Sequence, residues 1–559
     1  MSTIRNVIAL GCCLSALAAP LAFSDEEGGH AASRHVLLIS IDGMHALDLH
    51  NCTIASTCPN MAALANTGVN YARTSTSKPS DSFPGLMAIV TGGTPKLVGA
   101  YYDVAYDRVL APPAADTGNG LLHGSCMTGQ PNGTRTEYEE GIDIDKTMLN
   151  GGGPYGMYDG GYKSIDPNKL VRDPFKSCAP VYPWNFIRAN TIFGVIHKAG
   201  GFTAWSDKHA AYSAVSGPTG TSVPSNVDDY YSPDVNSNLI PLPGIRTAGG
   251  LDCSSIPKNN GGDWTGDFDN IKCYDQLKVN AVLNWIQGKA HLGGSSGHVP
   301  EIFGMNFQAV SVGQKLITGG GAVKGGYMDA AGTPTPSMLA EIEFVDGAIG
   351  QFVTALQNQK LLASTTIIIT AKHGQSAVDT NRFFPIPGHS GLNGTPPSGV
   401  LGSTYLPDSE LNQIGPTEDD ISLLWLKPGV DLTSAVNLLE GNAAAAGIGQ
   451  IFYGPSIETM YNAPGLPPNG DPRTPDIIIE PDVGVVYTTS TKKQAEHGGF
   501  AHDDTNVMLL VSNPHISPET VTSFVETTQV APTILKILGL DPNNLDAVQK
   551  EGTPVLPGF

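Results

Sequence analysis

Two short segments carry side chains that are well suited to chemistry. Residues 35–41 form an apolar run that ends at Asp42, which predicts a buried strand that delivers a carboxylate to its C-terminal end. Ser82 lies in a hydroxyl-rich turn, and the apolar stretch 86–90 after it predicts a helix. In open α/β sheets, ligands bind at the carboxyl ends of strands and at helix N-termini. A strand-end acid alone is more often structural, so its role depends on what else reaches the same place.

Two histidines and a lysine occupy comparable positions later in the chain. Lys372 and His373 directly follow the run 365–370, whose β-branched residues predict a strand that is buried on both faces. His497 lies in a polar, glycine-rich turn, and a glycine follows each histidine, which leaves room for a ligand. An acid, a hydroxyl and two histidines indicate a hydrolase whose serine nucleophile is held by cationic groups or a metal.

The elements that must position these residues alternate between strands and helices. We expect further strands at 201–205, 302–308, 421–426 and 507–511, and helices at 191–199, 338–357 and 529–538. In the helix 338–357 the apolar residues follow a period of 3.6 and form one stripe, which consists of Ile342, Val345, Ile349, Phe352 and Leu356. This alternation predicts an α/β fold with a largely parallel sheet flanked by helices.

Loop-like segments interrupt the framework. We interpret the stretches at about 104–190, 213–275 and 380–418 as insertions into one domain that spans residues 35–545, with a C-terminal tail at 546–559. The chain has 559 residues, of which 40% are hydrophobic and 15% charged, and its net charge is −21. This composition is that of a globular protein and argues against a nucleic-acid polymer as partner, although a small anion can bind in a locally positive pocket.

The N-terminus carries the features of a secretory signal peptide. Arg5 precedes a short apolar stretch at 7–19 that ends in small residues, so we expect a signal peptide at 1–24, a linker at 25–34 and a secreted or periplasmic mature chain. No later run is long and apolar enough to span a membrane. Export leaves six cysteines in an oxidising compartment, and the simplest pairings are Cys52–Cys58 and Cys253–Cys273.

These motifs resemble those of the type I phosphodiesterase and nucleotide pyrophosphatase family, within the alkaline phosphatase superfamily. The four motifs stand in the family's order, and they are Ile-Asp-Gly at 41–43, Asp-Ser-Phe-Pro at 81–84, His373-Gly374 and His497-Gly498. The resemblance implies an alkaline-phosphatase-like fold and cleavage of phosphodiester or pyrophosphate bonds in a small phosphate ester through a covalent intermediate on Ser82. It also implies one or two divalent metal ions, zinc in this family, with the ligands Asp42, Ser82, His373 and His497.

The chain departs from the family pattern at several positions. Lys372 stands where the family has a metal-binding Asp, and Gly85 stands where it has an Asn that donates to the phosphoryl oxygen. The family's mid-chain Asp and His align with Val310 and Gln314, which leaves Gln308 and Gln314 as the nearest polar candidates for contact with the substrate. A charged lysine cannot ligate a metal, but it can act as a point charge against phosphate, so we assign Lys372 a catalytic role.

Other interpretations stay open at this level. Asp207 and His209 follow a predicted strand and could supply missing metal ligands, although a surface turn is the simpler explanation. The insertions could shape a pocket for a phosphomonoester or a sulfate ester. The missing acid before His373 favours a third possibility, a metal-poor, inactive protein that only binds a ligand. A serine-hydrolase motif at 293–297 lacks the strand and helix that such an elbow requires.

Overall fold

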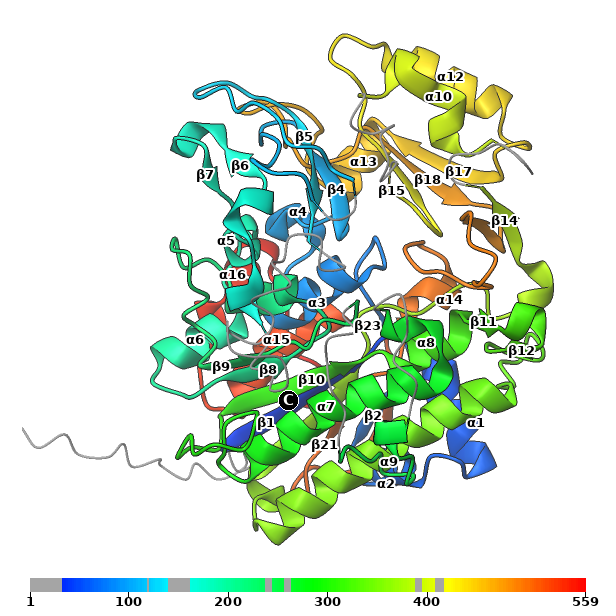
Figure 1. Cartoon of the computed structure of the whole chain (residues 1–559). Helices are drawn as coiled ribbons and strands as arrows, with labels where there is room; N and C mark the ends of the chain where they lie inside the picture. Colours follow the sequence, from blue (N-terminus) through cyan, green and yellow to red (C-terminus); the bar gives the residue numbers. More distant parts are fainter. Residues whose placement is uncertain are drawn as a thin grey trace, which may run out of the picture. The chain divides into compact units, whose positions relative to one another are not determined.

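A largely parallel sheet forms the centre of the protein (Figure 1). The computed structural model describes residues 33–117, 120–138, 161–236, 244–255, 263–387, 395–407 and 417–559. In these ranges eight strands form the sheet, in the order β22 (Glu519–Val521), β2 (Val69–Tyr71), β21 (Leu510–Ser512), β13 (Thr365–Thr370), β1 (His35–Ile41), β10 (Ile302–Phe307), β8 (Ala204–Ser206) and β9 (Asp229–Tyr231). The sheet confirms the predicted fold class.

The middle strands are apolar because helices cover both of their faces. All residues of β10 and β13, and all of β1 except His35, are buried. β1 pairs in parallel with both neighbours, with Ser40 opposite Thr370 of β13 and opposite Asn306 of β10. The carboxyl ends of the three strands therefore meet at one edge of the sheet.

Two groups of helices cover the sheet. One group consists of α2 (Pro59–Thr67), α7 (Phe268–Ile286), α8 (Ala309–Lys315) and α9 (Pro336–Asn358), and the other of α3 (Ser82–Thr91), α6 (Ile192–Lys198) and α15 (Val530–Ile537). α9 is the helix predicted at 338–357, and its apolar stripe is confirmed as core, because each of the five side chains is at most 2% exposed. Apolar residues that recur at this period bury one face of the helix.

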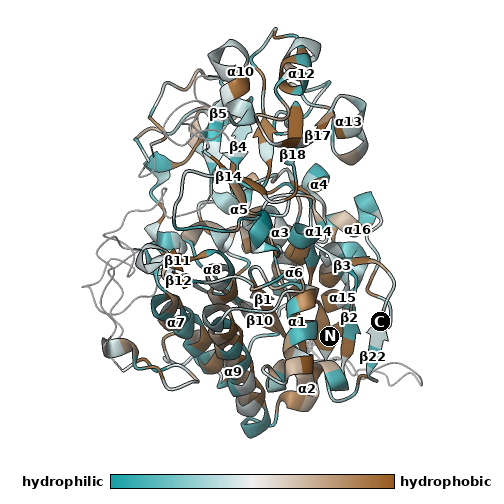
Figure 2. Ribbon diagram, turned by 90° about the vertical axis from the view of Figure 1, so that its right-hand side faces the viewer, coloured by the Kyte–Doolittle hydropathy of each residue, from teal (hydrophilic) through white to brown (hydrophobic). Residues whose placement is uncertain are grey.

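A second, antiparallel sheet lies later in the chain. Its described strands are β15 (Thr417–Glu418), β16 (Ser422–Leu424), β18 (Ile477–Pro481) and β17 (Ile448–Tyr453), in that order, and α10 (Pro397–Tyr405), α12 (Leu432–Gly441) and α13 (Pro455–Met460) accompany them. β18 is largely brown in Figure 2 because it carries three consecutive isoleucines, all buried. The strand predicted at 421–426 is therefore present, but it belongs to this smaller sheet.

Short elements fill the connections. They are the strand pairs β4 (Val104–Asp107) with β5 (Thr134–Glu137), β6 (Arg172–Asp173) with β7 (Ala179–Pro180), β11 (Ile317–Thr318) with β12 (Val323–Lys324) and β14 (Phe384–Ile386) with β19 (Val485–Tyr487), the strands β3 (Thr74–Ser75), β20 (Asn506–Val507) and β23 (Val525–Glu526), and the helices α1 (Ala46–Ala55), α4 (Pro95–Val98), α5 (Pro183–Phe186), α14 (His502–Thr505) and α16 (Asp546–Glu551).

Several sequence expectations differ from the structure, and one of them is that the loop-like segment 380–418 contains the helix α10. The segment 213–275 is not loop throughout, because it contains the edge strand β9 of the central sheet and the start of α7. The strand expected at 507–511 is divided into β20, which pairs with β3, and β21, which pairs with β13 and β2. Three residues are too few for β9 to show a period in the sequence.

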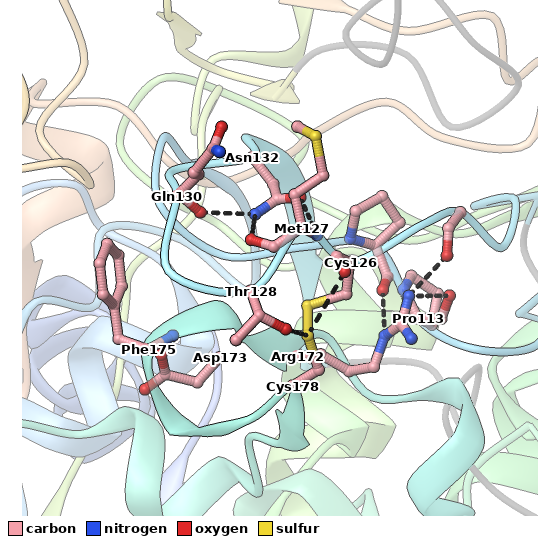
Figure 3. Close-up of a disulfide and its surroundings, with 12 residues drawn as sticks. Pro113, Cys126, Met127, Thr128, Gln130, Asn132, Arg172, Asp173, Phe175 and Cys178 are labelled. Carbon is pink, nitrogen blue, oxygen red and sulfur yellow. Dashed lines mark hydrogen bonds between the residues drawn. A yellow bond between two sulfur atoms is a disulfide. The ribbon is translucent and has the colours of Figure 1, made fainter.

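Disulfides fasten the connections in the described part of the chain. The predicted pairs Cys52–Cys58 and Cys253–Cys273 are confirmed, and the third bond joins Cys126 to Cys178. Beside this third bond the Thr128 hydroxyl lies 3.6 Å from Cys178 Sγ (Figure 3). The disulfide Cys126–Cys178 joins two residues that are 52 positions apart within the first predicted insertion.

The expected signal peptide at 1–24 lies outside the described residues, as does all of the linker at 25–34 except Ser33 and Arg34. None of the helices in the described ranges combines the length and the apolar character that crossing a membrane requires.

Candidate active site

Four neighbouring parallel strands end at the same edge of the central sheet and deliver the polar residues of the site. Asp42 follows β1, Gln308 follows β10, and Lys372 with His373 follows β13. The fourth strand, β8, pairs in parallel with β10 and is followed directly by Asp207 and Lys208. This edge is where ligands bind in open α/β folds.

Ser82 is the first residue of α3 and meets the strand ends. The preceding Asp81 caps the helix, since its carboxylate accepts a hydrogen bond from the Phe83 backbone amide at 3.0 Å. Ser82 Oγ lies 2.9 Å from Lys208 Nζ, and 3.2 Å from both Asp42 Oδ2 and His373 Nε2. Its hydroxyl is thus surrounded by a carboxylate, an imidazole and an ammonium group.

Asp42 is fully buried and is held by donors on both carboxylate oxygens. Asn306 Nδ2 donates to Oδ1 at 2.8 Å, and Gln308 Nε2 donates to Oδ2 at 2.6 Å. Burial by itself would raise the pKa of Asp42, but the nearby Lys372 ammonium and the His373 ring hold it well below its usual value. Asp42 is therefore a carboxylate at neutral pH.

Two lysines bring positive charge to the site. Lys372 is fully buried, and its Nζ lies 2.9 Å from Asp207 Oδ1 and 3.9 Å from Asp42 Oδ2. It also lies 4.1 Å from the centre of the Tyr212 ring, a cation–π contact. Lys208 Nζ lies 3.6 Å from Asp42 Oδ2. Asp42 Oδ2 therefore has two ammonium groups within 4 Å.

The same carboxylates act on the pKa values of the lysines. Burial lowers the pKa of Lys372 from its ordinary value, and Asp207 and Asp42 oppose this effect. Burial also acts to lower the pKa of Lys208, but there the carboxylates of Asp42 and Asp103 prevail and raise it. Lys208 is therefore an ammonium ion at neutral pH.

The two predicted histidines lie face to face at the site. The ring centres of His373 and His497 are 3.9 Å apart. His373 Nδ1 lies 2.7 Å from the Gly374 carbonyl, which can only accept a hydrogen bond. Nδ1 therefore carries a proton, and Nε2 faces Ser82 Oγ. Burial, with His373 next in effect, lowers the pKa of His497 well below its usual value, so this ring is neutral at neutral pH.

The residues present do not fit a two-metal centre. Lys372 occupies the position of a metal-binding acid, and Lys208 Nζ lies within hydrogen-bond distance of Ser82 Oγ, so a divalent ion beside Ser82 would have two ammonium groups as neighbours. A catalytic zinc site normally has three protein ligands. In the described ranges, no group of three His, Cys, Asp or Glu residues is arranged to hold a metal ion.

Two buried polar atoms near the site lack a hydrogen-bond partner among the described residues. They are Asp81 Oδ1 and His497 Nδ1, which lie 3.7 Å apart. Burial and the neighbouring Asp103 raise the pKa of Asp81 to about 7. A buried polar group without a partner is costly, so these two atoms mark a place where a ligand atom could bond.

The sequence candidates are only partly brought together. Gln308 contacts Asp42 directly, whereas Gln314 Nε2 donates to the Gly43 carbonyl at 2.7 Å and to the Tyr327 hydroxyl at 2.8 Å. The His209 ring turns to Asp234, with its Nδ1 at 3.4 Å from Oδ2. Gln314 and His209 therefore lie in separate hydrogen-bond networks.

Sequence reasoning misses two residues of the site. Lys208 directly follows the candidate ligand Asp207 after a strand, but an ammonium group is not a metal ligand and so does not stand out. Asn306 lies inside β10 and carries no motif.

The close approach of α3 explains Gly85, because a Cβ there would lie 2.1 Å from the Lys372 carbonyl oxygen. No amide side chain can therefore stand at that position.

Known proteins resemble this chain over the segments that form the central sheet and the candidate site. The sequence model of the type I phosphodiesterase / nucleotide pyrophosphatase family matches residues 36–123 and 326–504. Among solved structures, murine ectonucleotide pyrophosphatase / phosphodiesterase 5 is similar at 13% identity and a TM-score of 0.51, over 91% of this chain and 96% of that one. An inactive form of the murine protein, in complex with AMP, matches equally well. No curated protein matches the sequence.

The match covers the segments that carry Asp42, Ser82, His373 and His497, and the structural likeness supports the fold. The chain is a phosphoric ester hydrolase by class. Its sequence matches the model of the type I phosphodiesterase and nucleotide pyrophosphatase family over the two segments that carry these residues.

Proposed function

We propose that the chain hydrolyses phosphodiester or pyrophosphate bonds of a small phosphate ester, with Ser82 as the nucleophile. The observation that carries the proposal is the position of Ser82 Oγ, at the start of α3 and within 3.2 Å of Asp42, His373 and Lys208. A serine becomes an effective nucleophile when a base accepts its proton and positive groups stabilise its charge. Side chains of this chain supply both the base and the positive groups.

In the first step Ser82 Oγ forms a bond to phosphorus, and the bond from phosphorus to the leaving oxygen breaks with its electron pair. The Ser82 proton passes to His373 Nε2, which lies 3.2 Å from Oγ. Lys372 lies 3.9 Å from Asp42 and supplies positive charge beside the transferred group. In the second step a water molecule attacks phosphorus and releases one proton to the solvent, which neutralises the leaving oxygen of the first step. The bond from phosphorus to Oγ breaks with its electron pair, and the proton on His373 returns to Oγ.

The substrate reaches Ser82 beside two partly exposed groups. Ser82 itself has no exposed surface, whereas the side chains of Lys208 and His497 are 14% and 11% exposed. A phosphate ester that approaches beside them meets the Lys208 ammonium group and the His497 ring. The complex of the murine relative with AMP supports a nucleotide as part of the substrate.

The family normally depends on divalent metal ions, and zinc bound by Asp42, Ser82, His373 and His497 is the cofactor that the resemblance suggests. The positions of Lys208 and Lys372 argue against two such ions. No step proposed above requires one. Metal analysis of the purified protein tests whether the zinc that the resemblance suggests is bound.

We also propose that the protein acts outside the cytoplasm. Three disulfides join six cysteines of the described residues, and disulfides persist in oxidising compartments. The sequence features of a signal peptide at 1–24 support the same location. A small phosphate ester available outside the cell or in a periplasm is thus the substrate class that we expect.

Replacement of the nucleophile tests the proposal. We expect Ser82→Ala to lower kcat on a p-nitrophenyl phosphodiester by at least about 10³-fold, because the covalent step is lost. Ser80→Ala is the matched control, since its hydroxyl lies in the same turn but donates to the Asp504 backbone carbonyl and not to a side chain of the site. Turnover by Ser82→Ala close to that of the unchanged protein would contradict the proposal.

The complete burial of Ser82 favours a second candidate, a protein that binds a phosphate ester without cleaving it. Absence of turnover together with calorimetrically measured binding of AMP would support this candidate. A higher kcat/KM on p-nitrophenyl phosphate or p-nitrophenyl sulfate than on the diester would instead assign the chain to monoester or sulfate ester cleavage.

A further inference from the structure

Lys208 contacts the proposed nucleophile Ser82 directly. Lys208 Nζ donates a hydrogen bond of 2.9 Å to Ser82 Oγ and lies 3.6 Å from Asp42 Oδ2. In a metal-dependent site, this place beside the nucleophile belongs to the cation that stabilises the alkoxide. Here an ammonium group that belongs to the protein lies there.

Lys208 is held in this place by its neighbours. Its own backbone amide donates to Asp207 Oδ1 at 2.8 Å, and that carboxylate also accepts from Lys372 Nζ. Trp205 Nε1 donates to the other oxygen, Asp207 Oδ2, at 3.0 Å. The aromatic ring of Tyr212 lies 5.7 Å from Lys208 Nζ and 4.1 Å from Lys372 Nζ. Asp207 thus acts as a positioning residue that fixes both lysines through one buried carboxylate.

We propose that Lys208 is a catalytic residue that replaces a metal ion at Ser82, so that hydrolysis by this chain needs no divalent cation. The inference rests on the proposed function, because it assigns the charge that stabilises the Ser82 nucleophile. As the bond from Oγ to phosphorus forms and the leaving oxygen departs with its electron pair, the proton goes to His373. Lys208 keeps its own protons and donates one hydrogen bond throughout.

The geometry explains why a lysine can take this position. The charge developing on Oγ is stabilised by a group that is already oriented towards it and does not have to move. An ammonium group carries one positive charge, whereas a zinc ion carries two, and Lys372 supplies the second charge nearby. Lys208 also borders the exposed opening of the site, so the same ammonium group can contact a phosphoryl oxygen of the substrate.

Substitution of Lys208 tests the inference through kcat and KM separately. Lys208→Met keeps the length of the side chain but removes its charge, and we expect kcat on a p-nitrophenyl phosphodiester to fall by about 10²–10³-fold, as for loss of one oxyanion donor. KM should change by less than about fivefold, and Lys208→Arg should recover part of kcat. The matched control Lys198→Met, at an exposed position of α6, should behave as the unchanged protein.

A second measurement needs no variant and stays informative if Lys208→Met fails to fold. We expect the unchanged protein, after treatment with EDTA and desalting, to contain less than about 0.1 zinc per chain by elemental analysis and to keep its full kcat. Loss of activity on chelation that added zinc restores would overturn the inference.

The outcomes separate this inference from the proposed function. Turnover that persists in Ser82→Ala contradicts the proposed function, and the role of Lys208 with it. Turnover that is lost in Ser82→Ala but kept in a folded Lys208→Met contradicts the role of Lys208 alone. Loss in both variants, together with metal-free activity of the unchanged protein, supports both.

Discussion

At the scale of single residues, charge decides the character of the site. Asp42 and Asp207 are the carboxylates, Lys208 and Lys372 are the cations, and Ser82 lies between them. A single change from Asp to Lys at position 372 would remove a metal ligand and add the charge that repels the metal. Lys208 supplies a second ammonium group at the same strand ends, so that two protein cations are present where the metal ligand is missing.

The two glutamines of the sequence analysis offer a residue-scale prediction. Gln308 donates to Asp42, whereas Gln314 donates to Gly43 and Tyr327 in a separate network. We expect Gln308→Leu to lower kcat by about tenfold, because Asp42 loses a hydrogen bond to a charged group. Gln314→Leu should lower the free energy of unfolding by about 1–3 kcal/mol and leave kcat nearly unchanged.

The measurements are diester turnover and urea unfolding of each purified variant. A loss of kcat in Gln314→Leu that matches the loss in Gln308→Leu would show that the two networks act together. Equal kcat for Gln308→Leu and the unchanged protein would remove Gln308 from the site.

At the scale of elements, the parallel register of four strand ends accounts for the site. The apolar runs that precede Asp42 and His373 indicate their strands in the sequence, because residues buried on both faces of a parallel sheet are continuously apolar. The register between β1, β10 and β13 brings their ends together, and no pattern in the sequence specifies it. Lys208 follows the three-residue strand β8, which begins at Ala204. The sequence predicts this strand at 201–205, but it does not indicate which strands lie beside it in the sheet.

The contact between the second sheet and the segment before α14 gives an element-scale prediction. Glu480 on β18 accepts a hydrogen bond from the Phe500 amide at 2.8 Å, and burial, followed by the Asp504 carboxylate, raises its pKa to about 8. The folded protein therefore holds a proton that the unfolded chain releases above about pH 4.5. The stability should fall as pH rises from about 5 to 8.

We expect Glu480→Gln to weaken this fall by about 2 kcal/mol, because the amide stays neutral and its oxygen still accepts the Phe500 hydrogen bond. Urea unfolding at pH 5 and pH 8 measures the effect, with Glu458→Gln on the exposed side of α13 as the control. A variant with the same pH dependence as the unchanged protein would show that Glu480 does not hold this proton.

At the scale of the whole molecule, the order of the four motifs along the chain is enough to indicate the family. The family sequence model matches two separate segments, and the positions between them include β8, Asp207 and Lys208. This unmatched stretch is where the chain carries its distinctive cation. The motifs therefore predict the fold and the candidate residues Asp42, Ser82, His373 and His497, whereas the contact of Lys208 with Ser82 is visible only in the spatial arrangement.

The overall charge of −21 also fits the account. An acidic surface repels long polyanions, whereas the ammonium groups of Lys208 and Lys372 provide a local positive region for one small phosphate ester. The negative charge of the surface and the positive charge of the site together favour a small phosphate ester over a long polyanion.

The most direct test of the central claim is the mass of the peptide that contains Ser82, taken from protein quenched in acid during turnover of a p-nitrophenyl phosphodiester. We predict a covalent phosphoryl adduct on Ser82 that retains the second ester group, absent without substrate and absent in Ser82→Ala. Continued release of p-nitrophenolate with no modified Ser82 peptide at any quench time, under conditions in which breakdown of the intermediate limits the rate, would contradict a serine nucleophile.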